Sequence, residues 1–145
     1  NASALLQQAL AESPAAAAAT TLLGHRHDVP DLLCAADVLA IPSLYEGTAG
    51  VALEAMALRC AVVCTDLAGV HGVLAADDNA LLVPAGDRAA MAAALERVLT
   101  DPVLATHLRD RGLADFEERF TIEVAAAAME SFYADVIERG RKVGR

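Results

Sequence analysis

Aromatic side chains are scarce in this sequence of 145 residues: they make up 3% of it, and tryptophan is absent. Alanine supplies 34 positions within a hydrophobic total of 56%. Because alanine is the best helix former and lets backbones pack closely, this composition favours helices over a β-sandwich. The length is that of one domain, large enough to bury a hydrophobic core.

Long apolar runs are also missing. No uncharged stretch is long and apolar enough to cross a bilayer, and the N-terminus lacks the basic segment and apolar core of a signal peptide. We therefore expect a cytoplasmic protein. Any peripheral contact with the inner membrane face would come from a part of the protein outside this sequence.

Basic residues and cysteines are few. Eleven Lys and Arg stand against 20 Asp and Glu, a net charge of −9, which argues against nucleic acid as a partner. This charge does not exclude a nucleotide-sugar, because oriented amides and a few cations can hold one diphosphate. Cys34, Cys60 and Cys64 lack metal-finger spacing, and we expect reduced, buried thiols. No site is assigned to the four histidines.

Short apolar runs alternate with segments of helical periodicity. Strands are predicted at 20–23, 38–41, 61–64 and 81–83. Helices are predicted before Pro14, after Asp28, after Gly50, from the cap Asp87, from Asp101-Pro102, and over residues 121–139, followed by a frayed basic tail. This order predicts an α/β fold: a Rossmann-like, doubly wound parallel sheet with C-terminal helices.

Two carboxylates bracket the turn that follows the predicted strand 38–41. Glu46 precedes Gly47 and Gly50, and Glu54 lies in the next helix. A turn of small residues before a helix presents free N–H groups and the helix dipole to an anion. Carboxylates accept hydrogen bonds from hydroxyls, which indicates ribose or a sugar ring. Ordinary parallel α/β units share this pattern, so a purely structural role stays an alternative.

Several landmarks occur in a fixed order around this turn. They are 23–33, 36–43, the Glu-x7-Glu element from Glu46 to Glu54, 61–66, 80–87, and Glu118-Arg119-Phe120-Thr121. From Gly24 to about Ile137 the chain resembles the C-terminal half of retaining glycosyltransferases of the GT-B architecture, in the large family 4 group. The resemblance implies that residues 1–145 are the nucleotide-sugar-binding domain of a larger enzyme.

The resemblance also implies roles for individual residues. Glu46 would orient the transferred sugar and stabilise an oxocarbenium-like centre, and Glu54 would bind the ribose. The donor-binding turn would be Gly47, Thr48, Ala49, Gly50 and Val51. Within it, the backbone amides of Ala49, Gly50 and Val51 would face the diphosphate. The loop around Arg26 would meet the nucleobase through main-chain groups, although a solvated surface cation is the equal alternative.

No cofactor is implied beyond the nucleotide diphosphate sugar as co-substrate. No Asp-x-Asp element follows a strand in the way that holds a metal against a donor diphosphate, so we expect no metal site and metal-independent transfer. The acceptor, whether sugar, lipid or small molecule, would bind the N-terminal domain, which is outside this sequence.

The sequence departs from the resembled pattern in two places. Members often carry Gly-Gly-x-Pro-Glu where Ala68-Gly69-Val70-His71-Gly72 stands, and often a glycine where Ala80 stands. If position 80 needs a positive φ, alanine costs about 1 kcal/mol. A non-catalytic module that binds a nucleotide or a protein partner is therefore the alternative function, and a nucleotide-sugar epimerase is a weaker one.

In the resembled half-domain six strands run in the order 3-2-1-4-5-6. We assign the four predicted strands to positions three to six, so the two central strands are missing. We expect the 145 residues alone to be sticky or partly unfolded and inactive.

Overall fold

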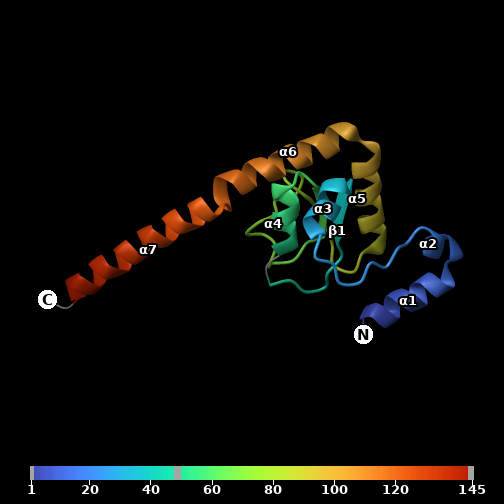
Figure 1. The fold of residues 1–145 in the computed structure, drawn as a ribbon, viewed down its shortest axis with the longest axis horizontal. Helices are drawn as coiled ribbons and strands as arrows, with labels where there is room; N and C mark the ends of the chain where they lie inside the picture. The colour runs from blue at the N-terminus through green and yellow to red at the C-terminus, as the bar shows by residue number, and fades with distance from the viewer. Residues whose placement is uncertain (1, 48–49, 144–145) are drawn as a thin grey trace.

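The computed structural model describes residues 2–47 and 50–143 (Figure 1). Along the chain the elements are α1 (Ala2–Glu12), α2 (Pro14–Ala18), α3 (Val29–Ala35), β1 (Val38–Ile41), α4 (Gly50–Ala57), β2 (Ala61–Thr65), β3 (Leu81–Val83), α5 (Arg88–Thr100), α6 (Pro102–Arg119) and α7 (Ile122–Val143). The alternation of strands and helices confirms the predicted α/β class.

The three strands form one parallel sheet in the order β1-β2-β3. Val38 pairs with Ala61, and Val63 pairs with Leu81. This order matches strands four, five and six of the resembled half-domain. Within the described ranges β1 has a partner strand on one side only, so its other edge carries unpaired backbone groups.

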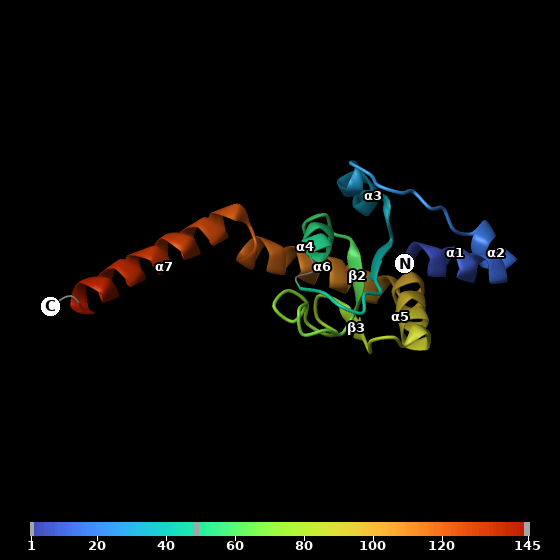
Figure 2. The same cartoon turned by 90° about the horizontal axis from the view of Figure 1, so that it is seen from below.

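Each face of the sheet is covered by its own hydrophobic core, because successive side chains of β2 point to opposite faces. Val62 and Cys64 belong to the core under α3 and α4, whereas Ala61 and Val63 belong to the core under α5. Helix α6 serves both: Leu108 lies in the second core, and Phe116 packs against the first. Figure 2 shows α3 and α5 on different sides of the strands.

Helix α6 also closes the amino ends of two strands. The Arg109 guanidinium donates a 2.8 Å hydrogen bond to the carbonyl of Asp37, just before β1. Asp110 pairs with Arg59, two residues before β2. The opposite, carboxyl edge of the sheet is therefore left to the loops that carry the candidate site.

Two of the predicted helix starts are confirmed with their caps. The Asp87 carboxylate accepts a 2.9 Å hydrogen bond from the Ala90 amide, and that of Asp101 accepts 3.0 Å bonds from the amides of Val103 and Leu104. A cap of this kind satisfies backbone donors that have no partner within the helix.

The strand predicted at 20–23 is wrong for this chain. The segment is irregular, and Leu22 and Leu23 are 55% and 50% exposed. A strand needs a neighbour to pair with, and no described strand lies beside this segment. Upstream, the short helix α2 was not predicted. Ser13 caps it by accepting a hydrogen bond from the Ala16 amide.

One further expectation needs correction, and the condition stated for Ala80 is not met. Helix α7 continues through the residues that were expected to fray after 139 and ends at Val143. Ala80 is buried but is not at a positive φ, so its side chain carries no strain of that kind. The left-handed residues other than glycine are Arg59 and Asp77 among the described positions.

Helix α7 extends away from the two cores (Figures 1 and 2). Several of its large apolar side chains are exposed, namely Ile122, Met129, Phe132, Tyr133, Val136 and Ile137. A search of the described residues found no helix with both the length and the apolar character needed to cross a membrane.

Candidate functional site at the carboxyl edge of the sheet

The carboxyl ends of the three strands meet at one edge of the sheet, as parallel pairing requires. The Thr65 hydroxyl at the end of β2 donates a 3.3 Å hydrogen bond to the carbonyl of Ile41 at the end of β1. The amide of Asp66 donates a 2.7 Å bond to the carbonyl of Val83 at the end of β3. In open α/β sheets this edge is where ligands bind.

Glu46 lies in the loop from β1 to α4 and is half-buried. The Ser43 hydroxyl donates a 2.5 Å hydrogen bond to its Oε1. Burial raises the pKa of the Cys64 thiol to about 11, and the nearby negative charge of Glu46 adds to this rise. The Glu46 carboxylate is therefore held close to the end of β2.

Helix α4 places its carboxylate on the outside. Ala52, Ala55 and Met56 point into the core, whereas Glu54 is exposed. A side chain in that position is free to accept hydrogen bonds from a ligand.

The predicted donor-binding turn is described only in part. Thr48 and Ala49 lie outside the described residues. Gly47 and Gly50 are exposed, and a Cβ built on either would meet nothing within 4 Å. Val51 is half-buried against the first core.

Arg26 lies on the segment before α3, where its guanidinium pairs with the carboxylate of Asp28 in two contacts, one of them 2.7 Å between Nε and Oδ1. This pairing raises the pKa of Arg26 and lowers that of Asp28. Both side chains are exposed, so the pair is weak. In the described part of the chain no hydrogen bond or ion pair joins Arg26 to Glu46 or Glu54.

Around Arg26 is an open pocket of about 410 Å³ that includes His25 and His27, whose ring centroids are 4.9 Å apart. This is the segment that the resemblance places against the nucleobase. No hydrogen bond between the described residues connects this segment to the Glu46 loop, so its contact with the nucleobase stays a prediction.

The segment 66–74, which contains the departure from the resembled pattern at 68–72, follows β2 at the same edge of the sheet. Nε2 of His71 lies 2.5 Å from Oδ1 of Asp66, and the Arg119 guanidinium donates a 2.9 Å hydrogen bond to the carbonyl of Gly72. No role is predicted for His71 from the sequence, yet it follows a buried strand by six residues, which is the signal that could have placed it at this edge.

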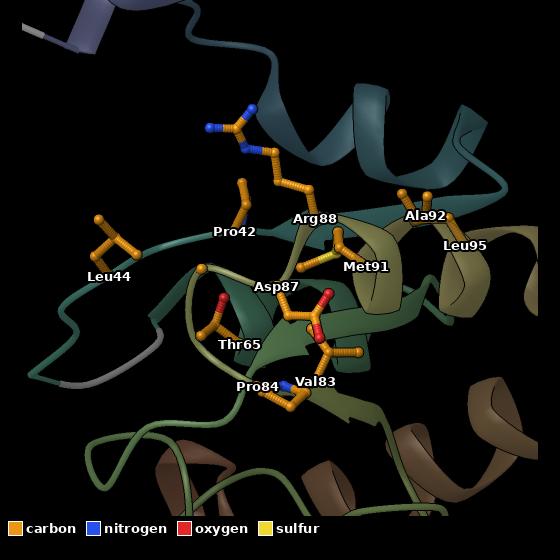
Figure 3. A pocket seen from close by; sticks show the side chains of 11 residues that line it. Pro42, Leu44, Thr65, Val83, Pro84, Asp87, Arg88, Met91, Ala92 and Leu95 are labelled. Atoms are coloured by element: carbon orange, nitrogen blue, oxygen red, sulfur yellow. The ribbon is translucent and has the colours of Figure 1, made fainter.

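An apolar cavity of about 470 Å³ opens beside the same edge, between the loop after β1 and the start of α5 (Figure 3). Pro42, Leu44, Met91 and Leu95 line it, with the cation of Arg88 at α5. Within residues 2–47 and 50–143, no three His, Cys, Asp or Glu side chains gather as a metal site would require.

A parallel sheet, helices on both faces and a carboxylate-bearing turn at its carboxyl edge define a Rossmann-like α/β domain. The family model of the glycosyl transferases group 1 matches residues 2–101, and the chain belongs to this family. Its structural neighbours are glycosyltransferases of the GT-B architecture.

Individual relatives agree with this assignment. The D-inositol 3-phosphate glycosyltransferase of Streptomyces bingchenggensis is 33% identical over 116 residues, which cover 80% of this chain and 25% of that protein. The C-terminal domain of a glycosyl transferase group 1 family protein (LpcC) from Francisella tularensis is 25% identical, with a TM-score of 0.63 over 71% of this chain and 53% of that one.

The fold is also that of Anabaena HepE, crystallised with UDP-glucose, which has a TM-score of 0.71 at 24% identity over 77% of this chain and 31% of that one. The chain spans between 25% and 36% of the length of the first curated relatives that it matches.

Proposed function

We propose that the chain is the donor-binding part of a retaining glycosyltransferase that transfers a sugar from a nucleotide diphosphate sugar. The observation that carries the proposal is the placement of Glu46, which Ser43 holds at the carboxyl edge of the sheet just before α4. Membership in the glycosyl transferases group 1 supports the reaction class, and the UDP-glucose complex of HepE supports the type of donor.

Each part of the site has a proposed task. The Glu46 carboxylate hydrogen-bonds the hydroxyls of the transferred sugar and stabilises the positive charge that develops at its anomeric carbon. The first amides of α4, from Gly50 and Val51, face the diphosphate, with Gly47 and the undescribed Thr48 and Ala49 completing the turn. Glu54 binds the ribose, and the loop at Arg26 meets the base.

The transfer is proposed to need no metal, because the sequence lacks the Asp-x-Asp element that would hold one. Residues outside this sequence would bind the acceptor and supply further cations for the leaving diphosphate. The proposed setting is the cytoplasm.

The experiment uses the whole parent protein. A thermal-shift panel of UDP, GDP, ADP and their sugars identifies the donor, and NMR then gives the anomeric configuration of the product with and without EDTA. We expect donor-dependent stabilisation, a retained configuration and activity in EDTA. An inverted product or loss of activity in EDTA contradicts the proposal, and donor binding without turnover favours the non-catalytic alternative.

A further inference from the structure

The loop that carries Glu46 rests directly on the backbone of Gly69. A Cβ built on Gly69 would lie 2.1 Å from the carbonyl oxygen of Glu46 and 3.0 Å from that of Gly47. Ordinary Cβ contacts begin at about 3.4 Å, so any side chain at position 69 would force these two backbones apart by more than about 1 Å.

Glycine is needed here for space and not for its backbone angles. The glycines with positive φ in the described ranges are Gly24 and Gly86, and Gly69 is not one of them. A positive φ therefore adds no strain to alanine at position 69, and the effect argued here for its methyl group is the clash.

The segment on the Gly69 side cannot give way easily. Val70, the next residue, is fully buried in the first core, and Leu74 is 2% exposed. Two hydrogen bonds also hold the segment: the amide of Asp66 donates to the carbonyl of Val83 in β3, and Arg119 donates to the carbonyl of Gly72. Moving it would disturb close-packed core contacts.

The segment on the Glu46 side is held much less firmly. Leu44 and Tyr45 are 74% and 86% exposed, and in the part of this loop that the structure describes, residues 42–47, the side-chain hydrogen bond is the one from Ser43 to Glu46. The loop at Glu46 would therefore be the part that moves when a methyl group is added to Gly69.

We propose that Gly69 is a positioning residue for the transfer reaction. Because it has no side chain, the loop that carries Glu46 packs directly on its backbone, and this contact determines the position of the Glu46 carboxylate. The inference rests on the proposed function of Glu46. A displacement of about 1 Å in a reacting group can lower the rate of an enzyme about 100-fold. Gly69 would thus act on the rate through Glu46 without touching the donor itself.

The test compares Gly69→Ala with Gly140→Ala in the whole parent protein. Gly140 lies in α7, outside the site, and a Cβ there would meet nothing within 4 Å, so it is the control for adding a methyl group without a clash. We expect Gly69→Ala to lower kcat about 100-fold with the donor KM within a few-fold of wild type. Hydrogen exchange of the peptide 43–47 should become faster, while Gly140→Ala should change neither quantity.

Each other outcome counts against the proposal. Unchanged kcat and unchanged exchange at 43–47 would mean that the loop does not depend on Gly69. Loss of the folded state in Gly69→Ala would also overturn it, because the core segment and not the loop would then have moved. If the wild-type protein transfers no sugar, the proposed function fails, but the exchange measurement still decides whether Gly69 seats the loop.

Discussion

Ser43 and Glu46 form a closed turn in which the Ser43 hydroxyl donates a 2.5 Å hydrogen bond to the Glu46 carboxylate. This bond fixes one oxygen of the carboxylate, and in the proposed function the other oxygen would contact the donor sugar. A carboxylate that is oriented before the substrate arrives loses less conformational freedom on binding, which is how preorganised groups stabilise developing charge.

The first prediction separates the two glutamates of the Glu-x7-Glu element. Glu46→Gln should mainly lower kcat, because a carboxylate beside the reacting sugar acts most strongly in the transition state. Glu54→Gln should mainly raise the donor KM, because a contact to ribose acts equally in both states. Steady-state kinetics of the parent enzyme measures both. Unchanged kinetics in both variants would assign the pair a structural role.

The second prediction concerns the three cysteines. The expectation of three buried thiols is wrong for Cys34, which is exposed, and is confirmed for Cys60 and Cys64, which are buried. Burial raises the pKa of both buried thiols, for Cys64 to about 11, so at pH 8 about one molecule in a thousand carries a Cys64 thiolate. Iodoacetamide should therefore label Cys34 first.

Peptide mass spectrometry of the native parent protein, with a urea-denatured sample as the control, gives the order of labelling. Equal labelling of Cys34 and Cys64 in the native sample would show that the end of β2 is open to solvent.

A third prediction concerns the buried side chain of Asn79, which joins two parts of the fold. Its Nδ2 donates to the Asp115 carboxylate at 2.7 Å and to the Val73 carbonyl, and its Oδ1 accepts from the Ala75 amide. Asn79→Leu would leave the Val73 carbonyl and the Ala75 amide unpaired in the interior and would leave the Asp115 carboxylate only its bond from Arg111, so we expect a loss of about 2–4 kcal/mol in unfolding free energy.

Hydrogen exchange of the β3 amides under increasing urea measures this loss. The double variant Asn79→Leu with Asp115→Leu is the control, because it removes both ends of the buried bond and should recover part of the stability. A loss below about 1 kcal/mol in the single variant would contradict the buried network.

A fourth prediction follows from the pair between Asp78 and Arg111, whose Nε–Oδ1 distance is 3.0 Å. The hydrogen bonds from Arg111 lower the pKa of Asp78 below its usual 3.8. The pair therefore stabilises the fold above that usual value, and this stability is lost as the pH falls through the lowered pKa.

The difference in stability between wild type and Asp78→Asn should be constant from about pH 5 to pH 8 and should shrink as the pH falls below 3.8 toward the lowered pKa of Asp78. It should be small and sensitive to salt, because both side chains are more than 40% exposed. Urea melts across this pH range provide the measurement. A difference that grows on acidification would exclude the pair as its source.

The last prediction is that residues 1–145 alone self-associate and bind no donor measurably. The outer edge of β1 offers unpaired backbone groups, and an open apolar strand edge is a template for pairing. Sedimentation, hydrogen exchange and titration with UDP- or GDP-sugars compare the isolated chain with the parent protein. A well-protected monomer with micromolar donor affinity would show that the assignment of missing central strands is wrong.

Local signals predicted much of this fold. The short apolar runs at 38–41, 61–64 and 81–83 became strands, and Asp87 and Asp101 became helix caps, because a cap depends only on neighbours a few residues away. The segment 20–23 has a similar apolar composition but no strand beside it. A segment becomes a strand only if a neighbouring strand is there to pair with it, so the composition of 20–23 alone could not show whether it forms a strand.

The site was predicted less completely. Glu46 and its turn stand out because glycine and carboxylate spacing is visible in sequence. The contact between Gly69 and Glu46 joins positions 23 residues apart, and the bond between Asn79 and Asp115 joins positions 36 apart. Neither carries a local signature, since each depends on how the loops and α6 pack in three dimensions.

Helix α6 contributes Leu108 to one core and Phe116 to the other. Its Arg109 donates a hydrogen bond to the carbonyl of Asp37, just before β1. Detachment of α6 would therefore expose apolar residues of both cores at once. The two cores should therefore melt in a single cooperative step, although they lie on opposite faces of the sheet. In this small domain, cooperativity would come from one shared helix and not from one continuous interior.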